Sequence, residues 1–347
     1  MKVLVTGGAG MVGSHAAEYY AIKNPKNKVV VLDNLMRSTI FGYDKASVEF
    51  NWNYLKKYKN IERIKGDVRN DKDVDKAIGK GVDVVIHTAG QPGVPSSVRM
   101  PKEDFSINAF GTLNVLEAAR KKSKDTIVVY CSTNKTFGEN VDKLKLVEKK
   151  QRYVYKDVVG VNEEMSTDLT GHTPYGVSKL VGDLYVQEYS HIYKMKTGVF
   201  RMSCTYGTRQ FGFEDQGWVA WFIIAALFNK PITIYGDGKQ VRDMLYVDDL
   251  VEAFDRFVES DMERGLFNIG GGPKNTISLL EFLDELELLT GKRPKTGFAD
   301  WRPSDQKVYI TDTRKVEKML NWKIKTPVKQ GIRILTEWVK QNQSCFI

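Results

Sequence analysis

Short apolar runs alternate with helix-like stretches over the first half of the chain. The runs are rich in valine and isoleucine, and they end near a glycine or a polar residue. This pattern is typical of strands that are buried on both faces of a parallel sheet and joined by helical crossovers. The predicted strands cover residues 2–6, 28–32, 61–65, 82–87 and 126–130, and the predicted helices cover residues 14–22, 70–78 and 108–121.

The alternation weakens after about residue 207. Beyond that point we predict a strand over residues 231–235 and helices over residues 219–228, 248–260, 278–290 and 328–342. Ser278 and Glu281 have the spacing of a capping box, which marks the first turn of a helix. The connection over residues 34–60 is long for a crossover, and residues 52–59 can form a helix within it. The pattern as a whole predicts an α/β protein.

Composition narrows the class of protein without identifying an activity. Of the 347 residues, 42% are hydrophobic and 11% are aromatic, which excludes a disordered chain. The three cysteines, Cys131, Cys204 and Cys345, indicate a reducing compartment rather than a disulfide scaffold. The longest apolar run, residues 218–228, is about half of the ~20 residues that a membrane span needs. We therefore expect a cytoplasmic protein without a membrane segment or a signal peptide.

The net charge of +9 raises the question of polyanion binding. However, the basic residues are spread along the chain and interleaved with acidic ones, as in residues 143–156. A lysine-rich solvated surface, as found in many heat-adapted proteins, explains this balance. We expect no nucleic-acid partner, and polyanion binding stays as the alternative.

A glycine-rich segment directly follows the first predicted strand. It fits T-G-x-x-G-x-x-G over residues 6–13 and G-x-G-x-x-G over residues 8–13, and a helix is predicted to follow it. Glycines there allow a sharp turn and a close approach to a pyrophosphate at the helix N-terminus. Asp33 ends the next strand about 20 residues on, where a carboxylate can bind a ribose diol and would repel a 2′-phosphate. The spacing predicts a site for NAD rather than NADP.

A second motif, Y-x-x-x-K, pairs Tyr175 with Lys179. Residues four apart share one face of a helix, so the two side chains are expected to lie together. The usual pKa of tyrosine is ~10, and a lysine ammonium together with an oxidised nicotinamide ring would lower it toward that of a usable base. Upstream, Ser132 and Thr133 follow a strand, and a hydroxyl there can share a proton with a substrate and Tyr175.

Together these features resemble the extended short-chain dehydrogenase/reductases, and more narrowly their NAD-dependent nucleotide-sugar epimerases and dehydratases. The resemblance extends over nearly the whole chain. The residues that carry it are residues 6–13, Asp33, Asp67, Ser132, Thr133, Tyr175, Lys179, residues 236–243 and residues 300–306. The resemblance implies a Rossmann-type doubly wound parallel sheet with a smaller, interwoven α/β substrate domain. The NAD-binding domain would comprise residues 1–207 and 241–262, and the nucleotide-sugar domain residues 208–240 and 263–347.

The resemblance also implies the roles of individual residues. Tyr175 would be the base, Lys179 the cofactor anchor and Thr133 the hydroxyl that shares the proton. The implied cofactor-binding residues are Gly7, Gly10, Met11, Val12, Gly13, Asp33, Asn34, Asp67, Val68, Thr88, Gln91, Asn108 and Lys179. Two of them have a structural alternative, because Asp67 can cap the helix over residues 70–78 and Asn108 can cap the helix that it begins.

Three local features distinguish the branches of this family. The dehydratases carry Asp-Glu after the Thr, whereas this chain has Asn134 and Lys135, which disfavours dehydration. The 4-epimerases usually carry Asn at the position of Cys204. Residues 132–135, 209–211, 215–218 and 238–243 instead resemble the CDP-paratose 2-epimerase (CDP-tyvelose 2-epimerase) branch. The alternatives are a UDP-glucose/UDP-galactose 4-epimerase and, outside enzymes, a cofactor-sensing protein on the same fold.

Arginine is suited to the nucleotide end of such a substrate, because its planar guanidinium pairs with phosphate oxygens. Arg242 and Arg302 are the candidates, with a surface ion pair to Asp243 or Asp305 as the alternative. The full set of predicted substrate-binding residues is Asn134, Cys204, Gln210, Arg242, Arg302 and Asp305.

The resemblance implies a reaction without net redox change. Tyr175 would remove a hydroxyl proton while hydride moves to a tightly bound NAD, and the hydride would return to the other face of the resulting ketone. It also implies a homodimer formed through the helices over residues 108–121 and 175–193. The four histidines are scattered without metal-ligand spacing, so no metal site is expected.

Overall fold

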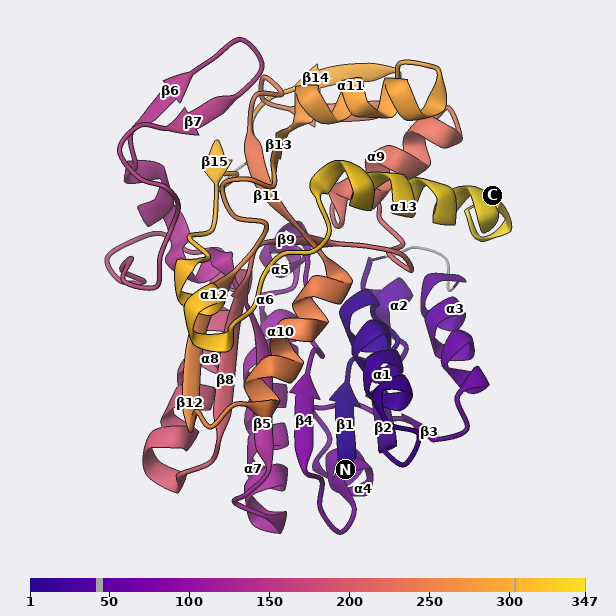
Figure 1. Ribbon diagram of the computed structural model, residues 1–347, viewed down its shortest axis with the longest axis vertical. Coiled ribbons are helices and arrows are strands. Elements are labelled where there is room, and N and C mark those ends of the chain that lie inside the picture. The colour runs from indigo at the N-terminus through magenta and orange to yellow at the C-terminus, as the bar shows by residue number, and fades with distance from the viewer. Residues whose placement is uncertain (42–45, 303, 347) are drawn as a thin grey trace. The chain divides into compact units, whose positions relative to one another are not determined.

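A computed structural model of the chain describes residues 1–41, 46–302 and 304–346. The chain divides into two compact units (Figure 1). Unit 1 comprises Met1–Thr136, Thr173–Arg201 and Val251–Phe267, and unit 2 comprises Phe137–His172, Met202–Leu250 and Asn268–Ile347.

The division differs from the expected domain boundaries mainly at residues 137–172 and 241–250, which group with unit 2. The first of these segments contributes Phe137, Val141 and Val161 to a small core around Tyr309. The local sequence pattern shows that this segment has apolar residues to bury. It does not show whether they pack on the adjacent sheet or on a distant segment.

Unit 1 is built on a seven-stranded sheet in the order β12-β8-β5-β4-β1-β2-β3. Its strands are β1 (Lys2–Thr6), β2 (Lys28–Asp33), β3 (Ile61–Lys65), β4 (Val84–His87), β5 (Ile127–Thr133), β8 (Thr197–Met202) and β12 (Arg264–Ile269). Val3 pairs in parallel with Val29 on one side and with Val84 on the other. The five predicted strands are confirmed, although β4 starts two residues later and β5 extends to Thr133.

The helical segments of unit 1 mostly alternate with these strands. They are α1 (Met11–Lys23), α2 (Arg37–Phe41), α3 (Ala46–Tyr54), η1 (Leu55–Lys57), α4 (Asp71–Ile78), α5 (Val94–Arg99), α6 (Pro101–Phe105), η2 (Ser106–Phe110), α7 (Gly111–Lys122), α8 (Pro174–Tyr193) and the part of α10 (Val247–Glu259) that follows Leu250. The segment predicted as one helix from residue 108 therefore begins earlier, at Pro101, and passes through a π-helical turn, η2.

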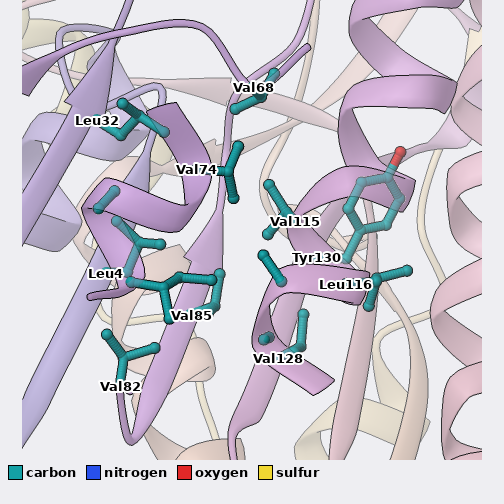
Figure 2. Close-up of a cluster of buried hydrophobic side chains, with 14 of the residues drawn as sticks. Leu4, Leu32, Val68, Val74, Val82, Val85, Val115, Leu116, Val128 and Tyr130 are labelled. Atoms are coloured by element: carbon teal, nitrogen blue, oxygen red, sulfur yellow. The ribbon is translucent and has the colours of Figure 1, made fainter. Parts of the chain in front are cut away.

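Alternate strand residues point to opposite faces of the sheet, and each face is covered by helices. Figure 2 shows Leu4, Leu32 and Val85 of one face beside Val74 of α4 and Val115 of α7. On the other face Phe200 packs against Phe254 of α10. Burial on both faces explains why the strands read as continuous apolar runs.

The strand order places β1 between β2 and β4. From β1 the sheet grows toward β2 and β3 on one side and toward β4 and β5 on the other. In sheets of this kind a ligand binds beyond the carboxyl ends of the strands where the direction changes. The loops in question follow Thr6 and His87, and they hold the glycine-rich segment and residues 88–90.

A buried ion pair ties three elements of unit 1 together. Arg201 of β8 donates to both carboxylate oxygens of Asp183 of α8, at 2.9 and 3.2 Å. Ser132 of β5 donates to the same carboxylate at 2.7 Å. Both charged side chains are almost completely buried, so neither charge is screened by water.

Unit 2 contains a four-stranded sheet, in which β13-β11-β15 is extended by the pairing of β9 with β11, and two further strand pairs, β10 with β14 and β6 with β7. Its strands are β6 (Leu146–Glu148), β7 (Tyr153–Tyr155), β9 (Cys204–Tyr206), β10 (Ile232–Tyr235), β11 (Val241–Tyr246), β13 (Thr276–Ser278), β14 (Thr296–Ala299) and β15 (Val308–Tyr309). Its other helical segments are α9 (Trp218–Leu227), α11 (Leu279–Thr290), α12 (Arg314–Leu320), α13 (Val328–Gln341) and η4 (Gln343–Cys345), with η3 (Asn134–Lys143) at the boundary of the units. The capping box of Ser278 and Glu281 is confirmed at the start of α11. Within the described part of the chain, every helix is too short or too polar to cross a lipid bilayer.

Candidate active site

The glycine-rich segment forms a tight turn at the carboxyl end of β1. Gly7 has φ of +69°, a backbone conformation that L side chains rarely adopt, and a Cβ there would lie 2.6 Å from the backbone nitrogen of Ala89. A Cβ on Gly13 would lie 2.3 Å from the carbonyl oxygen of Gly7. Both positions therefore require glycine, because the turn packs directly on the loop after β4 and on the first turn of α1.

The turn leads into the N-terminus of α1. The helix starts at Met11 after Gly10, no side chain caps it, and its first turn carries no acidic residue. The amides of Met11 and Val12 belong to the first turn, whose N–H groups have no acceptor within a helix. Such an end attracts an anion, so this cradle fits the pyrophosphate of NAD.

Asp33 lies at the end of β2 and supports the glycine-rich turn. Its carboxylate accepts hydrogen bonds from the backbone N–H of Ala9 at 2.9 Å and of Leu35 at 2.8 Å. Burial raises the pKa of Asp33, and these two bonds oppose that effect. The carboxylate retains acceptor positions for a ribose diol, in agreement with NAD as the cofactor.

Asp67 is held by its own neighbours. Arg69 donates to both of its carboxylate oxygens, at 2.9 and 2.7 Å, and the Asn34 amide donates to it at 2.9 Å. Burial by itself would raise the pKa of Asp67, but these bonds outweigh it and lower the pKa to about 2. The alternative that Asp67 caps the next helix is wrong, because Asn70 is the residue that caps α4.

The loop after β4 contains two further predicted cofactor residues. The Thr88 hydroxyl donates to the carbonyl of Thr6 at 2.6 Å, which joins the two loops at the switch point. Gln91 is buried, and its backbone N–H donates to the Asn108 side chain at 2.8 Å. Asn108 lies inside the π-helical turn, so the alternative that it is an N-cap is wrong. Val68 is in the core beside this region, where its carbonyl accepts a bond from Asn114 at 3.1 Å.

The proposed base lies in the first turn of α8. Pro174 occupies the first helical position and the Thr173 hydroxyl accepts from the N–H of Gly176 at 3.2 Å, which begins the helix just before Tyr175. Thr133, the last residue of β5, is hydrogen-bonded to the Tyr175 side chain. The two hydroxyls that the sequence predicts to share a proton therefore come together.

Lys179 lies one turn further along α8 and is 5% exposed. Its ammonium lies 4.3 Å from the centre of the Tyr130 ring, a cation–π arrangement. Burial lowers the pKa of Lys179 to about 8, while nearby acidic groups oppose that effect. The ammonium form still predominates at neutral pH.

The protonation of Tyr175 differs from the simple expectation of a lowered pKa. Burial raises the pKa of Tyr175 to about 12, the hydrogen bond from Thr133 lowers it, and the charge of Asp104 raises it further. Within the protein chain the side chain is therefore a neutral phenol at pH 7. The positive charge of an oxidised nicotinamide would be needed to make it a base.

His87, at the end of β4, is a buried neutral side chain. The Thr112 hydroxyl donates its proton to the Asn108 carbonyl at 2.6 Å, so it must accept from Nε2 of His87 at 2.9 Å. Nδ1 then accepts from the Thr6 hydroxyl at 2.6 Å. Burial lowers the pKa of His87 to about 3. Among the residues that the structure describes, no group of three His, Cys, Asp or Glu side chains is arranged to hold a metal ion.

The predicted arginines of unit 2 each pair with a carboxylate. Arg242 donates to Asp305 at 2.6 Å, which is one of the two partners that the sequence alternative named. Arg302 donates to Asp215 at 3.1 Å and lies 3.8 Å from the centre of the Tyr235 ring. The backbone N–H of Asp305 also donates to the carbonyl of Arg302 at 3.2 Å, so Arg242, Arg302 and Asp305 form one cluster.

The remaining predicted substrate residues are distributed over both units. In unit 2, the Cys204 thiol accepts from the Trp218 indole at 3.2 Å, and burial raises its pKa to about 12, so it is a neutral thiol. Gln210, also in unit 2, is buried. In unit 1, the Asn134 side chain accepts from the Thr133 hydroxyl at 3.3 Å, directly beside the proposed base.

Two buried residues near the base were not identified from the sequence. Asp104 and Ser178 are hydrogen-bonded to each other at 2.5 Å and join α6 to α8. Asp104 precedes Asn108 by four residues, which is a helical spacing, and Ser178 lies inside the Y-x-x-x-K motif. These signals were present, but the pairing joins residues 74 positions apart and therefore depends on the tertiary structure.

Comparison with known proteins identifies the family of the chain. A model of the NAD dependent epimerase/dehydratase family matches residues 3–270. The chain is 37% identical over 346 residues to the CDP-paratose 2-epimerase of Salmonella typhi, with 97% of this chain and 99% of that protein covered. It is 31% identical over 340 residues to the UDP-glucuronate 4-epimerase of Thermodesulfobacterium geofontis, with 98% and 96% covered.

A solved structure agrees over the same length. The UDP-glucuronic acid 4-epimerase of Bacillus cereus, crystallised with UDP-glucuronic acid and NAD, superposes with a TM-score of 0.82 at 27% identity, covering 99% of this chain and 100% of that chain. The glycine-rich turn, Asp33 and the Thr133–Tyr175–Lys179 group are the residues that the sequence predicts for cofactor binding and catalysis in such an enzyme. The chain therefore belongs to the NAD dependent epimerase/dehydratase family, and it is an NAD-dependent nucleotide-sugar epimerase with a Rossmann-type fold.

Proposed function

We propose that the enzyme inverts C2 of a CDP-linked dideoxyhexose and converts CDP-paratose, or a close analogue, to CDP-tyvelose. The observation that carries this choice is the 37% identity to a CDP-paratose 2-epimerase over nearly the whole of both chains. The local sequence supports it, because Asn134 and Lys135 stand where a dehydratase has its acidic pair.

The proposed mechanism begins with proton transfer from the sugar hydroxyl to Tyr175. Thr133 is hydrogen-bonded to Tyr175 and can share that proton, and Lys179 supplies a positive charge one turn away. NAD, when bound by the glycine-rich turn and Asp33, supplies the hydride acceptor and donor that lets the carbon be oxidised and reduced again.

Inversion then requires the keto sugar to turn over in the site. The oxidised carbon is planar, so reduction on its other face gives the opposite configuration when Tyr175 returns the proton to the oxygen. The neutral, weakly polar thiol of Cys204 is our candidate for a surface that permits this rotation.

We assign the pyrophosphate of the substrate to Arg242 and Arg302. Their present partners, Asp305 and Asp215, hold the guanidinium groups in place. A diphosphate offers the same bidentate acceptor geometry with more charge, so it can share or displace these contacts.

The substrate is tested by incubating the purified enzyme separately with CDP-paratose, UDP-glucose and UDP-galactose in deuterated water. We expect inversion at C2 of CDP-paratose, no consumption of added NAD, and no deuterium at the inverted carbon, because the same hydride returns. Deuterium at that carbon would replace the hydride mechanism by enolisation.

The same assay examines the second candidate, a UDP-sugar 4-epimerase. The similarity to the UDP-glucuronate 4-epimerase, at 31% identity over 98% of the chain, favours including this reaction. Turnover of a UDP-sugar at C4 with CDP-paratose left unchanged would select that candidate and exclude C2 inversion.

We also propose that two copies of the chain pair through the two predicted helical segments, residues 108–121 and α8, with the first extended back to Phe105 of α6. Apolar side chains on these elements are exposed: Phe105, Phe110, Val177, Leu184, Tyr185 and Ile192. An apolar face of this extent on neighbouring helices is typical of a surface that a partner covers. The identical face of a second copy is our proposed occupant, through a two-fold interface.

Light scattering tests this pairing. The wild-type protein is expected to have a mass near twice the 39.4 kDa of one chain, and Leu184→Lys is expected to reduce it to one chain. Leu288→Lys is the matched control, because Leu288 is 78% exposed on α11, outside the proposed face, against 54% for Leu184. A monomeric wild type, or equal dissociation of both variants, would argue against this interface.

A further inference from the structure

A buried carboxylate lies next to the base and anchor residues. Asp104 of α6 is 1% exposed, and its carboxylate accepts hydrogen bonds from Ser178 at 2.5 Å, from the Gln91 amide at 3.1 Å and from the Asn108 amide at 3.1 Å. Burying a charged carboxylate among neutral hydrogen-bond donors costs free energy. A neutral side chain could join α6 to α8 without that cost, so the charge itself calls for an explanation.

The directions of these hydrogen bonds follow from the chemistry of the groups. The Asn108 side-chain oxygen accepts from the N–H of Gln91 at 2.8 Å, so its NH₂ is the group that donates to Ser178 at 3.0 Å. The Ser178 hydroxyl therefore acts as an acceptor there. Its oxygen lies 2.5 Å from the Asp104 carboxylate and 3.1 Å from the Tyr175 carbonyl, so the shorter contact takes its single proton. Burial raises the pKa of Asp104, whereas the Ser178 hydrogen bond and the charge of Lys179 oppose that effect. All three partners donate to Asp104, which matches an ionised carboxylate.

Ser178 connects this carboxylate to the reacting end of α8. It stands three residues after Tyr175 and immediately before Lys179. Fixing the Ser178 hydroxyl to α6 therefore fixes the rotation of the helical turn that carries both residues. The charge of Asp104 also reaches both of them, because it raises the pKa of Tyr175 and opposes the lowered pKa of Lys179.

The other titratable groups that face Lys179 are neutral or already paired, although the charge of Asp183 also opposes the lowered pKa of Lys179. Cys131 of β5 and His87 of β4 are neutral at pH 7, because burial raises the pKa of the thiol to about 12 and lowers that of the imidazole to about 3. Tyr130 presents its ring. Asp183, on the next turn of α8, is already paired with Arg201. Asp104 differs from Asp183 because all of its hydrogen-bond donors are neutral, so no cation bonded to it offsets its charge.

We propose that Asp104 is a positioning residue: through Ser178 it orients the turn of α8 that bears Tyr175 and Lys179, and its charge, together with that of Asp183, favours the Lys179 ammonium while it disfavours the Tyr175 phenolate. The inference rests on the proposed function for the role of Tyr175 as the base. Its consequence is that Tyr175 stays a phenol until the positive nicotinamide is bound, which confines proton abstraction to the NAD-loaded enzyme.

The test is an ultraviolet titration of the Tyr175 phenolate in the NAD-loaded enzyme, with Tyr175→Phe identifying its signal. Asp104→Asn removes the charge and keeps a side-chain acceptor for Ser178. Without the negative charge the phenolate is less disfavoured, so the midpoint is expected to fall by at least about half a pH unit. Ser178→Ala is the matched control, because it removes the hydrogen bond and leaves the charge, and its midpoint is expected to stay within that limit.

The pH profile of kcat/KM provides a second measurement. Loss of the charge lowers the pKa of Tyr175 and of Lys179 together, so both limbs of the profile should move to lower pH in Asp104→Asn, whereas Ser178→Ala should lower the rate without moving them. An unmoved phenolate midpoint in Asp104→Asn, or an equal shift of the midpoint in both variants, would overturn the inference.

Asp104→Ser makes the same charge change if the Asn variant does not fold. The phenolate titration needs no sugar, so a wrong substrate assignment would not affect it.

Discussion

Tyr175→Phe is expected to lower epimerisation by roughly 10²–10⁴-fold, the usual contribution of a positioned acid–base group. The substitution removes one oxygen and leaves the ring in place. The loss should fall on kcat, because Thr133 cannot pass a proton to the ring, while the glycine-rich turn and Asp33, which are predicted to hold NAD, are untouched.

The measurement is turnover of the nucleotide sugar together with the amount of NAD that copurifies. Tyr185→Phe is the control, since it removes a hydroxyl from an exposed tyrosine ten residues along the same helix. We expect that control to keep wild-type turnover. Undiminished turnover of Tyr175→Phe would exclude Tyr175 as the base, and loss of NAD from that variant would indicate a structural role instead.

Arg201→Met is expected to lower the free energy of unfolding by about 3–5 kcal/mol. The Asp183 carboxylate is completely buried, and Arg201 is its charged partner in a bidentate contact. Methionine leaves that negative charge with only the neutral donors Ser132 and Gln187, at 2.7 and 2.6 Å. An uncompensated buried charge is among the few single changes that destabilise a domain so strongly.

Urea denaturation measures this effect, with Arg256→Met as the control. Arg256 forms a partly exposed pair with Glu252 on one helix, and its loss should cost about 1 kcal/mol or less. The double variant Arg201→Met/Asp183→Leu should regain most of the lost stability, because no charge then remains buried. Equal losses in Arg201→Met and Arg256→Met would show that the buried pair adds nothing beyond a surface contact.

Much of unit 1 is predictable from local pattern. The apolar runs mark β1 to β5, because strands buried on both faces need an apolar side chain at almost every position. The spacing of Tyr175 and Lys179 is helical, and α8 includes both. In unit 2, the start of α11 also follows from local sequence, because its capping box depends on two residues three apart. In each case the determining interaction lies within one turn or one strand.

Other features depend on residues far apart in the chain. The helix before α7 starts at Pro101 rather than Asn108, since the buried Asn108 side chain bonds to Gln91 and Ser178 instead of capping its own backbone. The segment over residues 137–172 groups with unit 2 because its apolar residues pack around Tyr309. The partners in these contacts are far apart in the sequence, so the periodicity of a single helix or strand does not reveal them.

The sequence by itself determined the α/β class and the glycine-rich turn with Asp33, and it predicted the residues that we propose as base, anchor and hydroxyl, because each depends on short spacings and on the chemistry of single side chains. Only the tertiary structure decided the electrostatics of the site. Packing around the site raises the pKa of Tyr175 and lowers that of Lys179. It also placed Asp104 against Ser178 and Asp183 against Arg201. Burial and long-range pairing set these pKa values and stabilities, since desolvation depends on everything packed around a group and not on its neighbours in the chain.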